Sequence, residues 1–136
     1  MRRVLIVVDM QNDFVDEEGA LSSPAARDII PFVCQEVQRA LETGDEVVFT
    51  LDTHLEDDAE FAKFAPHCLK GSWGQRLIPE LRELLSDQVA DQVHFVEKNR
   101  YSAFYRTDLE EYLGLAMGGG LYQYLLLFHR RRTGQP

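Results

Sequence analysis

Three segments of the chain are runs of mainly apolar and β-branched residues, and each run leads into an ionisable side chain. The runs cover residues 4–8, 47–51 and 93–97 and are followed by Asp9, Asp52 and Lys98, respectively. Such runs, each with a helical pattern after it, predict buried parallel strands. Because ligands bind at the carboxyl ends of strands in open α/β sheets, we expect these side chains to converge on one pocket, together with His54.

Helical patterns alternate with the runs. Residues 28–43 place apolar side chains at helical spacing and end at Gly44, and Pro31 fits in the first turn. Residues 75–86 predict a second helix that begins late, at Pro79. The sequence Thr107-Asp108-Leu109-Glu110 is a capping box and predicts a third helix, with Leu109, Tyr112 and Leu113 facing inward.

The remaining segments complete a single α/β domain over residues 1–136. We expect a polar loop at residues 11–23, a long loop at 54–74 and a fourth strand at 121–128. Loops as long as the second one are usually functional in a compact domain. The predicted fold is a three-layer α/β/α sandwich around a parallel sheet, incomplete at the C-terminus.

Composition narrows the class of protein. The net charge is −9 and the acidic residues are spread along the chain, so we expect no nucleic-acid partner. No apolar run is long enough to cross a bilayer or resembles a secretory signal, so we expect no membrane partner. The two cysteines, Cys34 and Cys68, form no disulfide framework and fit a reduced cytoplasmic protein. The sequence leaves open whether the chain forms a homo-oligomer.

The long loop carries a candidate metal site. Asp52, His54, Glu60 and His67 offer two carboxylates and two imidazoles. Mixed nitrogen and oxygen donors suit one divalent transition metal (Zn²⁺, Fe²⁺ or Mn²⁺) better than Ca²⁺ or Mg²⁺. The alternative is that acidic side chains of this loop are solvated, which we expect for residues 56–58.

Asp9 and Lys98 have two interpretations. They could form a buried ion pair, although such pairs are costly and are seldom placed at a strand end for stability alone. In a pocket, a desolvated carboxylate acts as a general base and an ammonium holds a nearby anion. Such a dyad requires a nucleophile, most naturally a cysteine.

Several motifs resemble the isochorismatase-like cysteine hydrolases, and most closely the nicotinamidase/pyrazinamidase subgroup. They are residues 4–14 (VLIVVDMQNDF), 52–54 (DTH), 66–74 (PHCLKGSWG), and Lys98 followed by residues 101–104 (YSAF). The resemblance covers residues 1 to about 115.

The resemblance implies an amidohydrolase that converts nicotinamide to nicotinate and ammonia in NAD salvage. Asp9 would be the general base and Lys98 its cationic partner. Phe14 and Phe64 would line the pocket of the small amide substrate. The metal that receives the ring nitrogen of nicotinamide would be bound by Asp52, His54, Glu60 and His67.

The chain departs from the family at the nucleophile. The family cysteine lies in a Thr-Asp-x-Cys stretch after the fourth strand, and this sequence contains no such stretch. We expect Cys34 to be a buried core thiol and Cys68 to be the non-catalytic cysteine common after the histidine ligand. Three interpretations stay open: an impaired amidohydrolase, a non-enzymatic remnant that binds metal or a small ligand, and an isochorismatase-like hydrolase of another substrate.

Residues 117–136 form a divergent tail without the family pattern. The resemblance ends abruptly after Gly114, close to the glycine run at residues 118–120. We hypothesise a change of reading frame there, since suitable codons for residues 129–131 spell Thr-Asp-Val in a shifted frame. The fourth strand would then expose residues 125–128, which favours aggregation.

Overall fold

Four parallel strands form the centre of the protein. The computed structural model describes residues 2–116 and 122–128. The strands are β1 (Arg2–Val8), β2 (Glu46–Asp52), β3 (Val93–Lys98) and β4 (Tyr122–Phe128). They are ordered β3-β2-β1-β4, and all three pairs are parallel. Their direction confirms the predicted parallel sheet.

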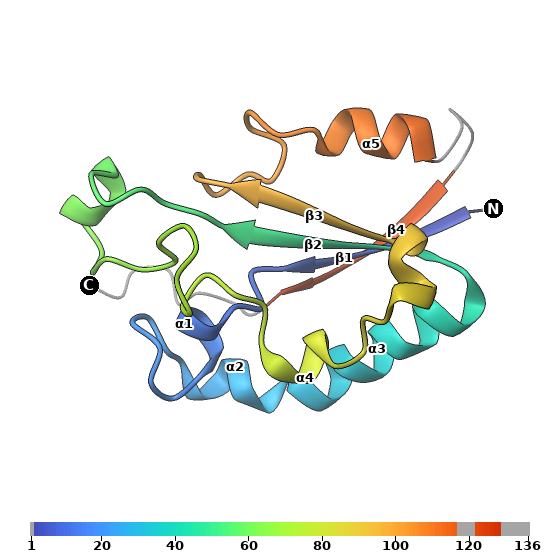
Figure 1. Ribbon diagram of the computed structural model, residues 1–136, viewed down its shortest axis with the longest axis horizontal. Helices are drawn as coiled ribbons and strands as arrows, with labels where there is room; N and C mark the ends of the chain where they lie inside the picture. The colour runs from blue at the N-terminus through green and yellow to red at the C-terminus, as the bar shows by residue number, and fades with distance from the viewer. Residues whose placement is uncertain (1, 117–121, 129–136) are drawn as a thin grey trace.

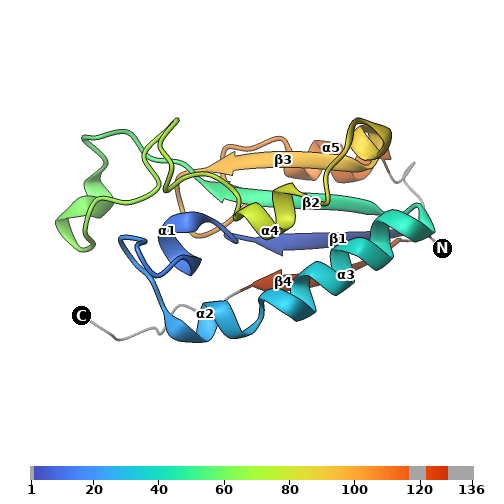
Figure 2. The same ribbon diagram turned by 60° about the horizontal axis from the view of Figure 1, so that its bottom comes forward.

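Helices cover both faces of this sheet (Figures 1 and 2). One face carries α1 (Asn12–Val15), α2 (Pro24–Asp28), α3 (Ile30–Thr43) and α4 (Pro79–Arg82), and the opposite face carries α5 (Leu109–Ala116). Two short 3₁₀ helices are η1 (Ala59–Ala62) and η2 (Asp87–Gln92). The three-layer α/β/α prediction is therefore confirmed. Among the residues described, no helix is both long and apolar enough to span a membrane.

The strand β1 supplies both halves of the hydrophobic core. Successive side chains of a strand point to opposite faces, so Leu5 and Val7 pack under α3 whereas Val4 and Ile6 pack under α5. All four are at most 3 % exposed. Burial on both faces explains why the run has no polar residue until Asp9.

The helix α3 forms where the pattern predicts it. Its buried side chains are Val33, Val37 and Ala40, and Pro31 lies in the first turn. Gly44 ends the helix at φ 79°, a left-handed conformation, and its N–H bonds to Ala40 O. The third predicted helix is present as α5, which begins at Leu109, and Thr107 Oγ1 accepts a hydrogen bond from Leu109 N at 3.3 Å, where a capping box would place Glu110 N.

Two of the predicted elements are wrong in extent. Residues 11–23 are not simply a polar loop, because they contain α1, whose four residues are all buried. The backbone N–H groups of Asn12 and Asp13 donate to Arg76 O and Gly74 O, a tertiary contact that the local sequence does not encode. The helix predicted over residues 75–86 shrinks to α4, which begins at Pro79 and ends at Arg82.

The third strand is less buried than its apolar run indicates. Among the strands that the structure describes, β3 is outermost and pairs with β2 alone, and Phe95 is 46 % exposed. The fourth strand is present as β4, paired with β1. The prediction that residues 125–128 are poorly covered concerns side chains that lie outside the described part of the structure. The predicted divergent tail at residues 129–136 lies outside it as well.

Candidate functional site

The carboxyl ends of β1, β2 and β3 meet at one edge of the sheet, beside the loop at residues 53–74 (Figure 1). Asp9 follows β1 at φ 58°, in the left-handed region that residues other than glycine seldom adopt. Its N–H is held by Thr50 O and Thr50 Oγ1, both at 3.2 Å, and Thr50 Oγ1 donates back to Asp9 Oδ1 at 3.2 Å. These bonds stabilise a strained backbone of the kind that clusters at functional sites.

Lys98, the last residue of β3, joins the parts of the site. Its side chain is 1 % exposed. Its Nζ donates to Asp9 Oδ2 at 3.3 Å, to Asp52 Oδ1 at 3.1 Å and to Arg100 O at 3.1 Å. An ammonium has three donors, so all of them are used. The predicted convergence of Asp9, Asp52 and Lys98 is confirmed.

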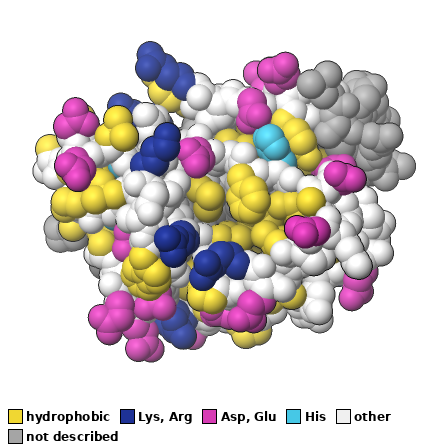
Figure 3. Space-filling model, viewed as in Figure 1, with side chains coloured by type: hydrophobic (Ala, Val, Ile, Leu, Met, Phe, Trp, Pro, Cys, Tyr) yellow, Lys and Arg dark blue, Asp and Glu magenta, His cyan; other side chains and the backbone are white. Residues whose placement is uncertain are grey.

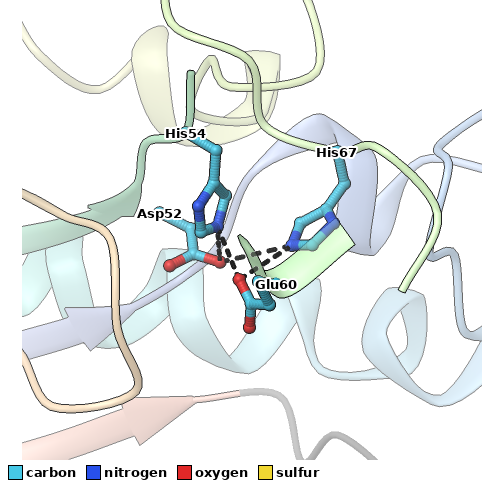
Figure 4. A group of neighbouring side chains, drawn as sticks. All are labelled: Asp52, His54, Glu60 and His67. Atoms are coloured by element: carbon cyan, nitrogen blue, oxygen red, sulfur yellow. Dashed lines mark hydrogen bonds and ion pairs between the residues drawn. The ribbon is translucent and has the colours of Figure 1, made fainter. Parts of the chain in front are cut away.

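Asp52 also contacts His54 and His67 through its second carboxylate oxygen, and Glu60 completes this group of four side chains (Figure 4). Asp52 Oδ2 lies 3.1 Å from His54 Nε2, and Glu60 Oε2 lies 3.0 Å from the same nitrogen. The corresponding distances from His67 Nε2 are 3.6 Å and 3.8 Å. One donor atom from each of the four residues lies within 4.8 Å of the others. The structure therefore brings together all four residues that the sequence nominates as metal ligands.

The donors fit a divalent metal. His67 Nδ1 bonds to Ala65 O at 2.7 Å, which directs Nε2 toward the two carboxylates. That Nε2 is buried and has no hydrogen-bond partner among the described residues. Buried polar atoms without partners are rare, and an imidazole nitrogen that faces carboxylates is a typical metal ligand. Burial disfavours the His67 imidazolium, but the contacts with Asp52 and Ala65 O and the charge of Glu60 outweigh it and raise the pKa of His67.

Asp58 is not solvated, and this part of the sequence prediction is wrong. Its side chain is 8 % exposed and accepts from His54 Nδ1 and from Glu60 N, each at 2.8 Å. Burial opposes its charge, but these hydrogen bonds and the charge of Arg100 prevail and lower the pKa of the Asp58 carboxyl. The structure makes Asp58 the N-cap of η1, a position at which an aspartate is preferred.

Three aromatic rings surround the two imidazoles. The rings of Phe14 and Phe64 lie 5.6 Å and 6.2 Å from the His67 ring. Phe61 lies 5.5 Å from both His54 and His67, and sequence reasoning missed it. An apolar wall of this kind excludes water from the donors and strengthens electrostatic interactions at the site.

The fully buried side chain of Gln11 fixes the position of Asp52. Its Oε1 accepts from Asp52 N at 2.8 Å, and its Nε2 donates to Asp52 O at 2.8 Å and to Gln75 O at 2.7 Å. The carboxamide thus imitates a neighbouring strand and extends the pairing of β2 beyond β1. Gln11 lies in the motif at residues 4–14, but its residue type alone does not reveal this role.

Asp13 fixes the segment that carries His67. Its Oδ2 accepts from Cys68 N at 2.7 Å and its Oδ1 accepts from Ala20 N at 3.1 Å. A Cβ at Gly74 would lie 1.9 Å from Asp13 Oδ2, so only glycine fits there. This arrangement also explains how Cys68 keeps its left-handed φ of 48°.

Neither cysteine has the environment of an activated nucleophile. Cys68 is completely buried, and its Sγ lies 3.8 Å from Gly74 O. Cys34 projects from α3 to the margin of the core and is only partly buried, whereas full burial was expected. Burial and the charge of Glu80 raise the pKa of the Cys34 thiol, which disfavours the reactive thiolate. Neither cysteine forms a disulfide.

An open cavity of about 260 Å³ lies at the carboxyl ends of β2 and β3, and Lys98 forms part of its lining. Thr53, Lys70, Tyr105 and Arg106 contribute to its lining. The loop after β3 also exposes Tyr101 and Phe104. On the face viewed in Figure 3, apolar side chains gather near the centre and charged ones of both signs surround them.

The fold is thus a parallel α/β sandwich with a lysine-linked carboxylate and an Asp-His-Glu-His cluster beside the carboxyl ends of its strands. The isochorismatase domain family matches residues 3–115, which is most of the chain. The chain therefore belongs to the isochorismatase family. This finding confirms the resemblance seen in the sequence motifs.

Individual relatives agree with this assignment. The uncharacterized isochorismatase family protein PncA of Bacillus subtilis is 36% identical over 115 residues, which cover 81% of this chain and 63% of that protein. The crystal structure of pyrazinamidase/nicotinamidase from Streptococcus mutans superposes with a TM-score of 0.85 at 31% identity, covering 94% of this chain and 72% of that one. Pyrazinamidase of Pyrococcus horikoshii in complex with zinc gives a TM-score of 0.78 at 28% identity, with 96% and 72% covered. The chain spans 51% to 63% of the length of the curated relatives it matches.

Proposed function

We propose that this chain carries the metal-binding and acid–base part of a nicotinamidase-type amidohydrolase. We further propose that its turnover is impaired because the nucleophilic cysteine is missing. The observation that carries the proposal is the double contact of Lys98, which links Asp9 to a ligand of the proposed metal site. The relatives named as nicotinamidases and pyrazinamidases, one of them in complex with zinc, support the same assignment.

In this proposal the substrate is a small aromatic amide. When bound, a divalent metal supplies a Lewis-acidic position for the ring nitrogen of a pyridine carboxamide. Asp52, His54, Glu60 and His67 hold that metal, and the rings of Phe14 and Phe64 border the substrate. Asp9 accepts a proton or hydrogen bond at the amide end, and Lys98 fixes the Asp9 carboxylate and offsets its charge.

The cysteines support impairment. Removing the nucleophile from a cooperating catalytic group typically costs several orders of magnitude, which leaves binding and residual electrostatic effects. Cys68 is completely buried and the pKa of Cys34 is raised, so neither replaces it. We therefore expect nicotinamide to bind without ammonia release at an enzymatic rate.

The test is a nicotinamide titration of the Zn²⁺-loaded and the metal-free chain, with ammonia assayed in parallel. We expect metal-dependent binding that His67→Ala abolishes, and no ammonia above the uncatalysed rate. Ammonia release at ordinary turnover that Cys68→Ala abolishes would contradict the impairment and identify the nucleophile. Absence of nicotinamide binding with every metal would refute the substrate assignment.

A second function is non-enzymatic binding of metal or of a small ligand. The burial of Cys68 and the raised pKa of the Cys34 thiol favour this function too. It predicts stoichiometric Zn²⁺ binding with no selectivity for pyridine carboxamides over their benzene analogues. The nicotinamide titration, repeated with benzamide, separates the two functions, because benzamide lacks the ring nitrogen.

A further inference from the structure

The acidic segment before η1 contains one carboxylate that lies against the proposed metal site without being one of the four donors. Asp58 Oδ2 lies 2.8 Å from His54 Nδ1, the imidazole nitrogen on the far side of the ring from Asp52 and Glu60. The imidazole of His54 is fully buried, and the Asp58 side chain is 8 % exposed. The contact is therefore shielded from solvent, unlike most contacts of loop carboxylates.

The other oxygen of the same carboxylate holds a second donor residue. Asp58 Oδ1 accepts from Glu60 N at 2.8 Å, which makes Asp58 the N-cap of η1. The turn of η1 places Glu60 Oε2 3.0 Å from His54 Nε2. One side chain thus orients two of the four donors, one from each end of the segment at residues 54–60.

We infer that Asp58 is a positioning residue that sets the affinity and geometry of the metal site by fixing the His54 tautomer and the Glu60 backbone. A hydrogen bond from Nδ1–H to Asp58 leaves the Nε2 lone pair of His54 for the metal. Outer carboxylates of this kind orient histidine ligands and increase their basicity. The inference rests on the proposed function, because it requires that His54 and Glu60 bind a metal.

Arg100, two residues after the end of β3, supports the arrangement. Its Nη1 lies 3.7 Å from Asp58 Oδ2, and its carbonyl oxygen accepts from Lys98 Nζ at 3.1 Å. The residues after β3 therefore contact both Asp58 and the lysine that binds Asp52. Asp58 is fixed by the fold of the site as well as by its own loop.

Two substitutions separate the contacts of Asp58. Asp58→Asn keeps the shape but has one acceptor oxygen, so it cannot accept from both His54 and Glu60. Asp58→Ser keeps a good N-cap for η1 and is too short to reach His54 as well. Asp57→Asn is the matched control, because it removes the same charge from the exposed neighbouring position.

The experiment measures Zn²⁺ affinity by competition with a chelator and the visible absorption spectrum of the Co²⁺-loaded chain, with thermal unfolding of each metal-free variant. We expect Asp58→Asn and Asp58→Ser to weaken Zn²⁺ binding by about 10–100-fold and to change the Co²⁺ spectrum, whereas Asp57→Asn matches the wild type. Asp58→Ser should unfold close to the wild-type temperature, since its cap is retained.

Two results would overturn the inference. If the wild type binds Zn²⁺ and both Asp58 variants bind it equally well with an unchanged Co²⁺ spectrum, the inference fails and the proposed function stands. If the wild type binds none of Zn²⁺, Co²⁺, Fe²⁺ or Mn²⁺, the metal site itself fails and the inference fails with it.

Discussion

Lys98 Nζ donates to Asp52 Oδ1 at 3.1 Å, while the second oxygen of the same carboxylate faces the two imidazoles. The adjacent ends of β2 and β3 make this contact, because Asp52 and Lys98 are partners in the strand register. The ammonium and the proposed metal site therefore share one carboxylate. A change at Lys98 is expected to affect the metal site as well as Asp9.

Replacing Lys98 with methionine should destabilise the metal-free protein. Two buried carboxylates would lose their cation, and removing one partner of a buried ion pair costs about 3–5 kcal/mol. Urea unfolding measures the loss, and added Zn²⁺ should restore part of it by compensating Asp52. Lys63→Met, at an exposed position, is the control and should change the free energy of unfolding by no more than about 0.5 kcal/mol. Equal stability of the two variants would contradict the buried role of Lys98.

Gly74→Ala should destabilise the protein because the new Cβ would overlap with the Asp13 carboxylate. Relief requires Asp13 to release Cys68 N, and we expect a loss of about 1–3 kcal/mol, as for other overpacked sites. Gly114→Ala is the matched control: its Cβ would meet nothing within 4 Å, and alanine favours the helix α5. Thermal unfolding should shift in opposite directions for the two variants, and parallel shifts would refute the steric argument.

Gln11→Leu should lower both stability and metal affinity. It removes three buried hydrogen bonds and leaves the backbone groups of Asp52 without partners, at about 1–3 kcal/mol for each buried group. Asp52 would then lose the bonds that set its position. Urea unfolding and Zn²⁺ titration measure the two effects, and Gln38→Leu on the exposed side of α3 serves as control. Unchanged Zn²⁺ affinity would show that Gln11 does not position the ligand.

The pH dependence should follow His67. Its pKa is raised in the metal-free protein, so the folded state binds a proton more tightly than the unfolded state, in which the pKa of histidine is about 6.5. The resulting stabilisation is complete below that value and is lost as the pH rises through the folded pKa. Zn²⁺ must displace this proton, so metal affinity should rise over the same range. The measurement is the free energy of unfolding of the wild type and of His67→Gln from pH 5 to 9. Identical pH profiles of the two proteins would contradict the role of His67.

The sequence by itself determined the strands and the identity of most of the site. Apolar runs ending at Asp9, Asp52 and Lys98 predicted a parallel sheet with a functional edge, because burial on both faces forces continuous apolar sequence. Donor chemistry nominated Asp52, His54, Glu60 and His67, which the structure brings within reach of one another. These features are local, because consecutive or nearby residues determine which strands are buried and which types of ligand the site offers.

Only the tertiary structure decided the residues that hold the site in place. Gln11, Asp13 and Asp58 are ordinary polar residues in sequence, and their roles arise from hydrogen bonds to segments that folding brings next to them. The exposure of Phe95 likewise depends on the position of β3 at the edge of the sheet that the described strands form. A hydrogen bond or a neighbouring strand is a relation between distant parts of the chain, so residue type alone cannot specify it.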